Sequence, residues 1–407
     1  MPDPVDELLR LACLTYEEGD GPQRWAAARG LLADDPSLGS ASLHAAAATN
    51  DVGAVRALLA DDPSTANADG GPFGWTPLCY LAYSRLDPEV PREATLTIAR
   101  LLLEAGADPN AGYQWNGLPT PFTVLTGAFG NGELGGAAQP PHPHSLALAR
   151  LVLEAGADPN DGQALYNRQF ATADDHLVLL FEFGLGRGDG GPWKARIGDA
   201  LDAPAALVHG QLSWAILHGM AERVALLADN GADLAAPFVD GRTPTTTAAL
   251  NAQDAIVDLL VERGAPPPAL DPAEAMVAAL LTGDRALVDA RRREHPDALE
   301  RARAERPGLI VWAYARGRLD ALPLLVELGF DVNRRARADV PREQEWETAL
   351  HLAAGDGDRT TAEKLLALGA DPSLVDGRFD ATALGWAEHF EQPELVALLA
   401  PLTREKT

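Results

Sequence analysis

The sequence predicts an all-α fold, a stack of repeated helix-turn-helix elements. The main observation is that an apolar helical stretch and its ending at residues 101–110 return almost unchanged at residues 151–160. Weaker copies of this ending follow further along the chain, and Thr-Pro or Thr-Ala openings precede several of them. A supersecondary element that returns along a chain is the signature of a repeat architecture, in which neighbouring repeats bury a shared core.

Each repeat ends in the same pattern. In residues 101–110 an apolar stripe is followed by Gly106 and then by Ala107, Asp108, Pro109 and Asn110. Glycine adopts positive φ without steric penalty and therefore caps helix ends, and the residue before a proline disfavours helical geometry. We therefore predict a helix C-cap followed by a turn at every copy. The further copies have their glycines at Gly156, Gly231, Gly264, Gly329 and Gly369.

The first helix of a repeat opens with threonine. A threonine side chain accepts a hydrogen bond from the free amides at the start of a helix, and proline suits the first helical turn. These openings predict where the first helices begin. They stand at Thr76-Pro77, Thr120-Pro121, Thr243-Pro244, Thr348-Ala349 and Thr382-Ala383.

Openings and endings of this kind resemble the ankyrin-repeat family, whose repeat is a β-turn plus two antiparallel helices with a Thr-Pro-Leu-His-x-Ala opening. The resemblance covers nearly the whole chain and implies one solenoid, residues 1–407, of roughly ten or eleven repeats with inserted loops. It implies an N-terminal capping repeat at residues 1–39, and a C-terminal capping repeat with a polar tail at residues 382–407. It also implies that His351, in the histidine position of its opening, hydrogen-bonds across adjacent turns.

The composition restricts the expected partners and compartment. Lys and Arg total 33 against 59 Asp and Glu, a formal net charge of -26. Such a surface repels phosphate backbones and anionic membranes, so the sequence predicts a basic or neutral protein partner, no nucleic acid and no membrane. The acidic N-terminus lacks the basic residues of a signal peptide, which indicates a cytoplasmic protein. The preference for Arg over Lys is typical of bacteria with GC-rich genomes.

The repeat is interrupted in an irregular central region, residues 110–195. Residues 127–144 are rich in glycine and proline, and we expect them to form a loop inserted between the two helices of one repeat. The aromatic residues Tyr113, Trp115 and Tyr166 lie in turns on either side of this insertion. They are expected either to line a binding groove or to pack on the ends of their own helices.

Polar residues near these aromatic rings complete a candidate site. Glu133 and His142 are the candidates for proton transfer, because carboxylates and imidazoles perform that chemistry, and Arg168 is the candidate anion contact. A zinc site needs three or four ligands in tetrahedral geometry, so no metal and no cofactor are predicted. The candidate binding residues are Tyr113, Trp115, Gln139, His144, Tyr166, Asn167 and Arg168.

Three functions are compatible with these features. The first is a non-catalytic scaffold that binds a protein partner on the concave face of the repeats. The second is a small-molecule binding protein or unconventional enzyme, with its site at the central insertion. The third is an inhibitor or immunity protein that holds one toxin tightly. The chain contains no G-x-S-x-G, Walker or H-E-x-x-H motif, which favours the first function over catalysis.

Overall fold

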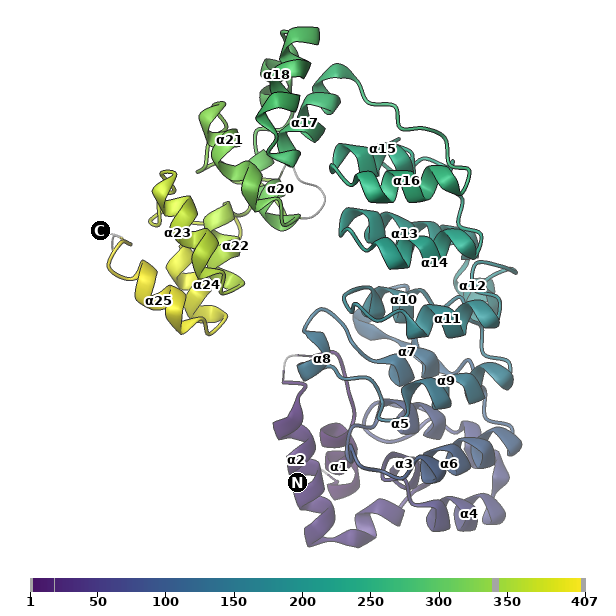
Figure 1. The fold of residues 1–407 in the computed structure, drawn as a ribbon. Helices are drawn as coiled ribbons and strands as arrows, with labels where there is room; N and C mark the ends of the chain where they lie inside the picture. The colour runs from purple at the N-terminus through teal and green to yellow at the C-terminus, as the bar shows by residue number, and fades with distance from the viewer. Residues whose placement is uncertain (1–2, 18, 339–343, 404–407) are drawn as a thin grey trace. The chain divides into compact units, whose positions relative to one another are not determined.

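The computed structural model describes residues 3–17, 19–338 and 344–403. The chain divides into two compact bodies. The N-terminal body contains residues 1–214 and 229–232, and the C-terminal body contains residues 215–228 and 233–407. Residues 404–407 of the predicted tail lie outside the described residues. Both bodies consist mainly of short helices (Figure 1).

The N-terminal body begins with helices that pair two by two. Its helices are α1 (Pro4–Ala12), α2 (Pro22–Asp34), α3 (Leu43–Ala48), α4 (Val52–Asp61), α5 (Pro77–Tyr83), α6 (Arg92–Glu104), α7 (Val124–Phe129), α8 (Gly135–Ala138), α9 (Ser145–Glu154), α10 (Gly162–Gln169), α11 (Asp175–Glu182), α12 (Gly191–Ile197) and the start of α13 (Pro204–Leu217). Short 3-10 helices are η1 (Pro36–Ser40), η2 (Pro63–Asn67), η3 (Trp115–Gly117) and η4 (Gly198–Ala200).

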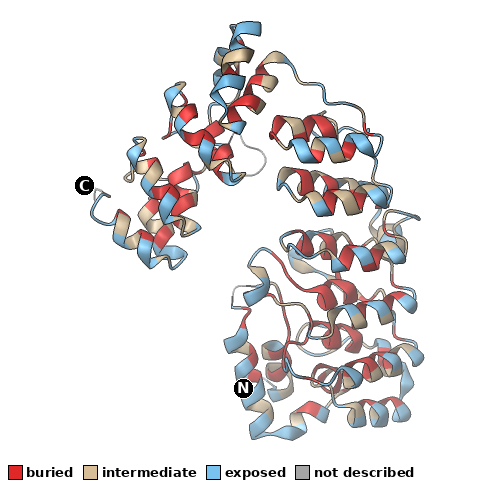
Figure 2. Cartoon of the chain, viewed as in Figure 1, coloured by how far each residue is buried: buried red, intermediate tan, exposed pale blue. Residues whose placement is uncertain are grey.

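The helices of the N-terminal body form two layers. The first helices α3, α5, α7 and α10 pack on one another in that order, and so do the second helices α4, α6, α9 and α11. The buried residues lie on the helix faces that meet neighbouring helices (Figure 2). In α3, for example, the four alanines Ala45–Ala48 are fully buried. No single pair encloses its own apolar stripe, so each depends on the next pair for its core.

Strands β1 (Gly112–Gln114) and β2 (Pro121–Thr123) form an antiparallel hairpin ahead of α7. Tyr113 pairs with Phe122 in its register. Helix α7 begins directly after the hairpin, because the Thr123 hydroxyl accepts from the amide nitrogens of Leu125 and Thr126. The hairpin is therefore an extension of the turn that precedes the first helix of its repeat.

The predicted helix endings are confirmed at the two matching copies. Gly106 has φ of 93° and Gly156 has φ of 103°, a region that residues with a side chain rarely adopt. After each glycine the chain turns back on the helix, and the Ala107 amide nitrogen donates to the carbonyl oxygen of Leu102 at 2.9 Å. This bond satisfies a carbonyl that the helix end leaves free.

An asparagine after each of several endings connects one turn to the next. Asn110 donates through Nδ2 to the Gly156 carbonyl oxygen at 3.1 Å, and its Oδ1 accepts from the Asp158 amide nitrogen at 2.8 Å. Both ends of one amide are thus used by the following turn. The same pair of bonds to a following turn is made by Asn67, Asn160 and Asn333. We call this series the asparagine ladder.

The predicted loop at residues 127–144 begins later than expected. Gly127 belongs to α7, which extends to Phe129, and the short helix α8 lies within the remaining segment. Gly127 is needed for packing, since a Cβ atom there would come within 2.4 Å of the Tyr83 ring. The prediction of a loop at residues 127–129 is therefore wrong, because this glycine permits close helix contact. We call residues 130–144 the insertion.

The C-terminal body contains the end of α13 and the helices after it. These are α14 (Ala221–Asp229), α15 (Pro244–Leu250), α16 (Asp254–Glu262), α17 (Pro272–Thr282), α18 (Arg285–Glu294), α19 (Ala298–Glu305), α20 (Leu309–Ala315), α21 (Leu322–Glu327), α22 (Ala349–Gly355), α23 (Arg359–Ala367), α24 (Ala383–His389) and α25 (Pro393–Leu399), with the 3-10 helix η5 (Leu319–Ala321). Within the described parts of both bodies, no helix combines the length and apolarity needed to cross a membrane.

The hydrogen bond expected of His351 is present in the C-terminal body. Its Nδ1 lies 2.8 Å from the Thr348 hydroxyl, and its Nε2 lies 3.1 Å from the Ala381 carbonyl oxygen in the turn before α24. Burial lowers the pKa of His351, so the ring is neutral at pH 7 and bridges the two turns. His44 makes a corresponding contact with the Ala68 carbonyl oxygen at 2.8 Å.

Candidate functional site

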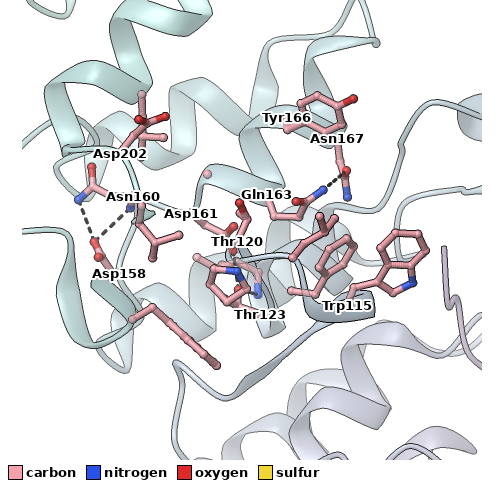
Figure 3. A pocket seen from close by; sticks show the side chains of 18 of the residues that line it. Trp115, Thr120, Thr123, Asp158, Asn160, Asp161, Gln163, Tyr166, Asn167 and Asp202 are labelled. Atoms are coloured by element: carbon pink, nitrogen blue, oxygen red, sulfur yellow. Dashed lines mark hydrogen bonds between the residues drawn. The ribbon is translucent and has the colours of Figure 1, made fainter. Parts of the chain in front are cut away.

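A cavity of about 950 Å³ lies in the N-terminal body (Figure 3). Its walls come from the segment between α1 and α2, the β1–β2 hairpin, the insertion, the start of α10 and the segment around α12. Side chains from distant parts of the sequence therefore meet around one space. Those used below are Tyr16, Trp115, Phe122, Thr123, Glu133, Gln139, Asp158, Asn160, Asp161, Gln163, Tyr166, Asn167, Trp193, Lys194 and Asp202.

One part of the cavity is aromatic. Figure 3 shows Trp115, Tyr166 and Asn167 on the same side of the view, and we call this part the aromatic end. The Trp115 indole is held by a hydrogen bond from its Nε1 to the Thr15 carbonyl oxygen at 3.0 Å. The Tyr166 hydroxyl donates to the Glu133 carboxylate, which links α10 to the insertion. Glu133 therefore belongs to the aromatic end as well.

Asn167 brings a buried amide to the aromatic end. The residue is 2% exposed, and its Oδ1 accepts from Gln163 Nε2 at 2.8 Å. Its Nδ2 makes no hydrogen bond of normal geometry to any described residue. The amide lies near the Tyr16 ring; burial raises the pKa of Tyr16, and the Asn167 side chain reduces that effect. A buried donor without a partner favours a ligand that supplies an acceptor.

Asp161 lies in the middle of the cavity wall and caps the start of α10. Its carboxylate accepts from the Thr123 hydroxyl at 2.5 Å, the Thr126 hydroxyl at 3.0 Å and the Ala164 amide nitrogen at 2.9 Å. Burial raises the pKa of Asp161, and these hydrogen bonds partly offset the rise. Asp161 is thus a helix cap that also fixes the hairpin, and its acceptor capacity is largely used.

The opposite side of the cavity is acidic. Figure 3 places Asp158, Asn160 and Asp202 together there, and we call this part the acidic end. Asp158 Oδ1 accepts from Asn160 Nδ2 at 2.8 Å. The nearby lining residue Lys194 donates through Nζ to the Leu201 carbonyl oxygen at 2.6 Å, so its charge is directed at the backbone.

Arg85 holds the insertion against the rest of the N-terminal body. Its guanidinium donates to the carbonyl oxygens of Pro140 at 2.8 Å, Gly127 at 2.6 Å, Ala82 at 2.9 Å and Ser84 at 2.9 Å. Burial lowers the pKa of Arg85 to about 10, so the group stays charged at pH 7. A buried cation satisfied only by backbone carbonyls acts as a clamp, and this one sets the position of the cavity wall.

The structure brings some of the predicted site residues together and separates others. Trp115, Glu133, Gln139, Tyr166 and Asn167 line the cavity. Four others are outside its lining and have other contacts. Tyr113 stacks on Trp75 with ring centroids 4.5 Å apart, His142 Nδ1 accepts from the His144 amide nitrogen at 3.0 Å, His144 Nε2 lies 2.6 Å from the Val90 carbonyl oxygen, and Arg168 pairs with Asp175 at 2.6 Å.

These contacts bear on the chemistry expected of His142 and Arg168. Burial lowers the pKa of His142 well below its usual range, with Arg85 and His144 adding to the effect. The ring is therefore neutral at pH 7, and it lies outside the cavity lining, as does the candidate anion contact Arg168. Arg168 is held by Asp175 in the first turn of α11, at 2.6 Å.

Several lining residues are not among the candidate site residues named from the sequence. Asp158 and Asn160 belong to a repeat ending, where they look like ordinary turn residues. Trp193 follows a glycine-rich stretch, and its Nε1 donates to the Asn110 carbonyl oxygen at 2.8 Å, which closes the cavity beside α12. Among the described residues, no group of three or more His, Cys, Asp or Glu side chains is arranged to hold a metal ion.

Residues 345–377 match the family model of the ankyrin repeat. In the structure this stretch contains α22, with Thr348 as its N-cap and His351 in its first turn, and α23. The match covers one ankyrin repeat, and the helical fold of the described residues is consistent with it. No curated protein shows a significant match to this chain.

Proposed function

We propose that this protein is a non-catalytic binding scaffold that takes a segment of a protein partner into the cavity of the N-terminal body. The ankyrin-repeat match supports the scaffold role, because stacked repeats of this kind commonly present a continuous surface to other proteins. We propose further that the regular helix pairs of both bodies are ankyrin repeats, with capping repeats at residues 1–39 and 382–407.

The observation that carries the proposal is the construction of the cavity. The hairpin, the insertion and the α12 segment all depart from the regular repeat, and all three contribute to the same walls. Segments that only connected helices would not be expected to line the same cavity. Exposed apolar side chains at the rim, such as Tyr166 at 42% and Leu118 at 46%, offer contact area to a partner.

The volume also favours a second candidate function, the binding of a small molecule. Small-molecule pockets enclose roughly 300–1,000 Å³, and the present cavity lies at the upper end of that range. The lining combines aromatic rings with a few convergent polar groups, as such pockets do. Of the two candidates for proton transfer, Glu133 lines this cavity and His142 does not.

Selection from a random dodecapeptide library displayed on phage tests the proposal. The full chain is the bait, and Tyr166→Ala and Val178→Ala are parallel baits. Both side chains are similarly exposed, at 42% and 48%, but Val178 lies outside the cavity lining. We expect peptides that are enriched on wild type and on Val178→Ala and lost on Tyr166→Ala. Enrichment that is absent, or equal on all three baits, contradicts a peptide-binding cavity.

A further inference from the structure

We propose that the partner segment is basic, with an arginine or lysine side chain held at the aromatic end of the cavity. This inference rests on the proposed function and adds the chemistry of the partner. Three independent features of the cavity support it: its charge, the pairing of aromatic rings with a carboxylate, and the unused amide of Asn167.

The first feature is the charge of the walls. Among the described lining residues, the carboxylates are Glu17, Glu133, Asp158, Asp161 and Asp202, and Lys194 is their only cationic counterpart. Lys194 is directed at backbone carbonyls, so it does not neutralise the space itself. Walls of low polarizability around such a cavity concentrate its negative potential. The net charge of -26 would attract a basic segment from a distance as well.

The second feature is the arrangement at the aromatic end. The Glu133 carboxylate is oriented by the Tyr166 hydroxyl, and the Trp115 ring is oriented by the Thr15 carbonyl. A cation placed there would meet a fixed carboxylate and the faces of aromatic rings, which attract it through their quadrupoles. The cavity wall already shows this chemistry, because the Arg196 guanidinium lies over the Trp193 ring at 4.6 Å.

The third feature selects a peptide over a free amine. Asn167 Nδ2 is a buried donor whose contact with Tyr16 falls outside normal hydrogen-bond geometry, whereas ammonium and guanidinium groups contain only donors. A backbone carbonyl beside the cationic side chain would supply an acceptor. Asn167 lies next to Tyr166 in the sequence and at the aromatic end in Figure 3, so one residue of a bound segment reaches both.

The acidic end of the cavity would contact a second part of the bound segment. Asp158 and Asp202 lie across the cavity from Trp115 and Tyr166 in Figure 3, with Asp161 between them. A second basic side chain further along an extended peptide would meet these carboxylates. The segment we propose therefore carries at least two cationic side chains, separated by the residues that cross the cavity.

The selected dodecapeptides provide the test. We expect them to be enriched in arginine and lysine relative to the unselected library. Replacement of those residues by the neutral analogues citrulline and norleucine should weaken binding by about tenfold or more, as expected for a charged pair shielded from solvent. Fluorine NMR of the full chain labelled with 5-fluorotryptophan should show the Trp115 and Trp193 resonances shifting with bound peptide. The Trp386 resonance, from the C-terminal body, should stay in place.

A charge-removing variant completes the experiment. Glu133→Gln should weaken the basic peptides about fivefold to tenfold and leave the citrulline analogues unaffected. Glu154→Gln, an exposed carboxylate on α9 outside the lining, is the matched control and should change neither. Equal binding of n-butylguanidinium and of the basic peptide would overturn the peptide requirement.

The failure of this inference is distinguishable from failure of the proposed function. Peptides that bind at Trp115 without basic residues, or that tolerate citrulline, would overturn the inference and leave the scaffold role intact. An absence of peptides that depend on Tyr166 would overturn both.

Discussion

The indole Nε1 of Trp115 donates a hydrogen bond to the carbonyl oxygen of Thr15, 100 positions earlier in the chain, at 3.0 Å. The bond joins the tip of the β1–β2 hairpin to the segment between α1 and α2. Two walls of the cavity are thereby connected by one donor and one acceptor. The hairpin tip itself is exposed at Leu118, and this bond is one of the contacts that hold it.

Trp115→Phe keeps an aromatic ring and removes the donor. We expect the N-terminal body to lose about 1 kcal/mol of unfolding free energy, the usual net value of one hydrogen bond. Hydrogen exchange should become faster at residues 112–123 and around Thr15. Exchange rates that stay at the wild-type values in both segments would show that other contacts hold the hairpin.

The Arg85 clamp predicts a large effect of a conservative change. In Arg85→Lys one ammonium replaces a planar group that reaches carbonyls on α5 and on the insertion, so several carbonyls lose their donor. We expect a loss of about 3 kcal/mol in urea unfolding, with faster hydrogen exchange across residues 130–144. Arg100→Lys, on the exposed face of α6, is the control and should change stability by less than about 0.5 kcal/mol. Equal stability of the two variants would contradict the clamp.

The pair Arg168–Asp175 predicts a dependence of stability on pH. A hydrogen bond from His176 and the charge of Arg168 hold the pKa of Asp175 at about 2, against the opposing effect of burial. A pKa lowered by folding gives stability that is present above the unfolded value near 3.9 and is lost as the pH falls towards 2.

Asp175→Asn should therefore cost about 1 kcal/mol at pH 6, a value reduced for solvent screening because the side chain is 45% exposed. The difference from wild type should shrink steadily in urea titrations between pH 5 and pH 3. A difference that stays constant over that interval would assign the effect to packing instead of charge.

Asp376 stabilises the turn before α24 in the C-terminal body. The residue is 3% exposed, and its carboxylate accepts from the amide nitrogens of Arg378 and Phe379 and from Trp386 Nε1 at 2.8 Å. Asp376→Ala leaves these donors unpaired and should cost about 3 kcal/mol in thermal unfolding of the full chain. Glu388→Ala, exposed on α24, is the control. A variant as stable as that control would show that water replaces the carboxylate.

The local parts of this fold can be predicted from the sequence, because their signals lie within a few residues. A glycine that ends an apolar stripe, such as Gly106, determines the conformation of its own turn. The role of Arg85 cannot be read in this way, since its acceptor Pro140 lies 55 positions away. Gly127 was misjudged for the same reason, because the Tyr83 ring that requires a glycine belongs to another repeat.

The candidate site follows the same division. The aromatic residues and the insertion could be identified as departures from a regular pattern, and Trp115, Glu133 and Tyr166 meet in the structure. His142 and Arg168 have side chains that suit chemistry, but their orientation depends on packing against distant groups. Asp158 and Asn160 carry no sequence signal beyond that of a turn, although they form the acidic end.

The asparagine ladder has a consequence for how such a chain changes over evolution. Each asparagine amide bridges two consecutive turns and therefore fixes the distance between them where the helices end. The hairpin and the insertion lie between Asn110 and the next turn in the sequence. The Asn110 amide nevertheless donates to the Gly156 carbonyl oxygen and accepts from the Asp158 amide nitrogen. The loops can thus be lengthened, shortened or exchanged while the ladder keeps consecutive turns in register, so the proposed binding surface and the architecture can vary independently.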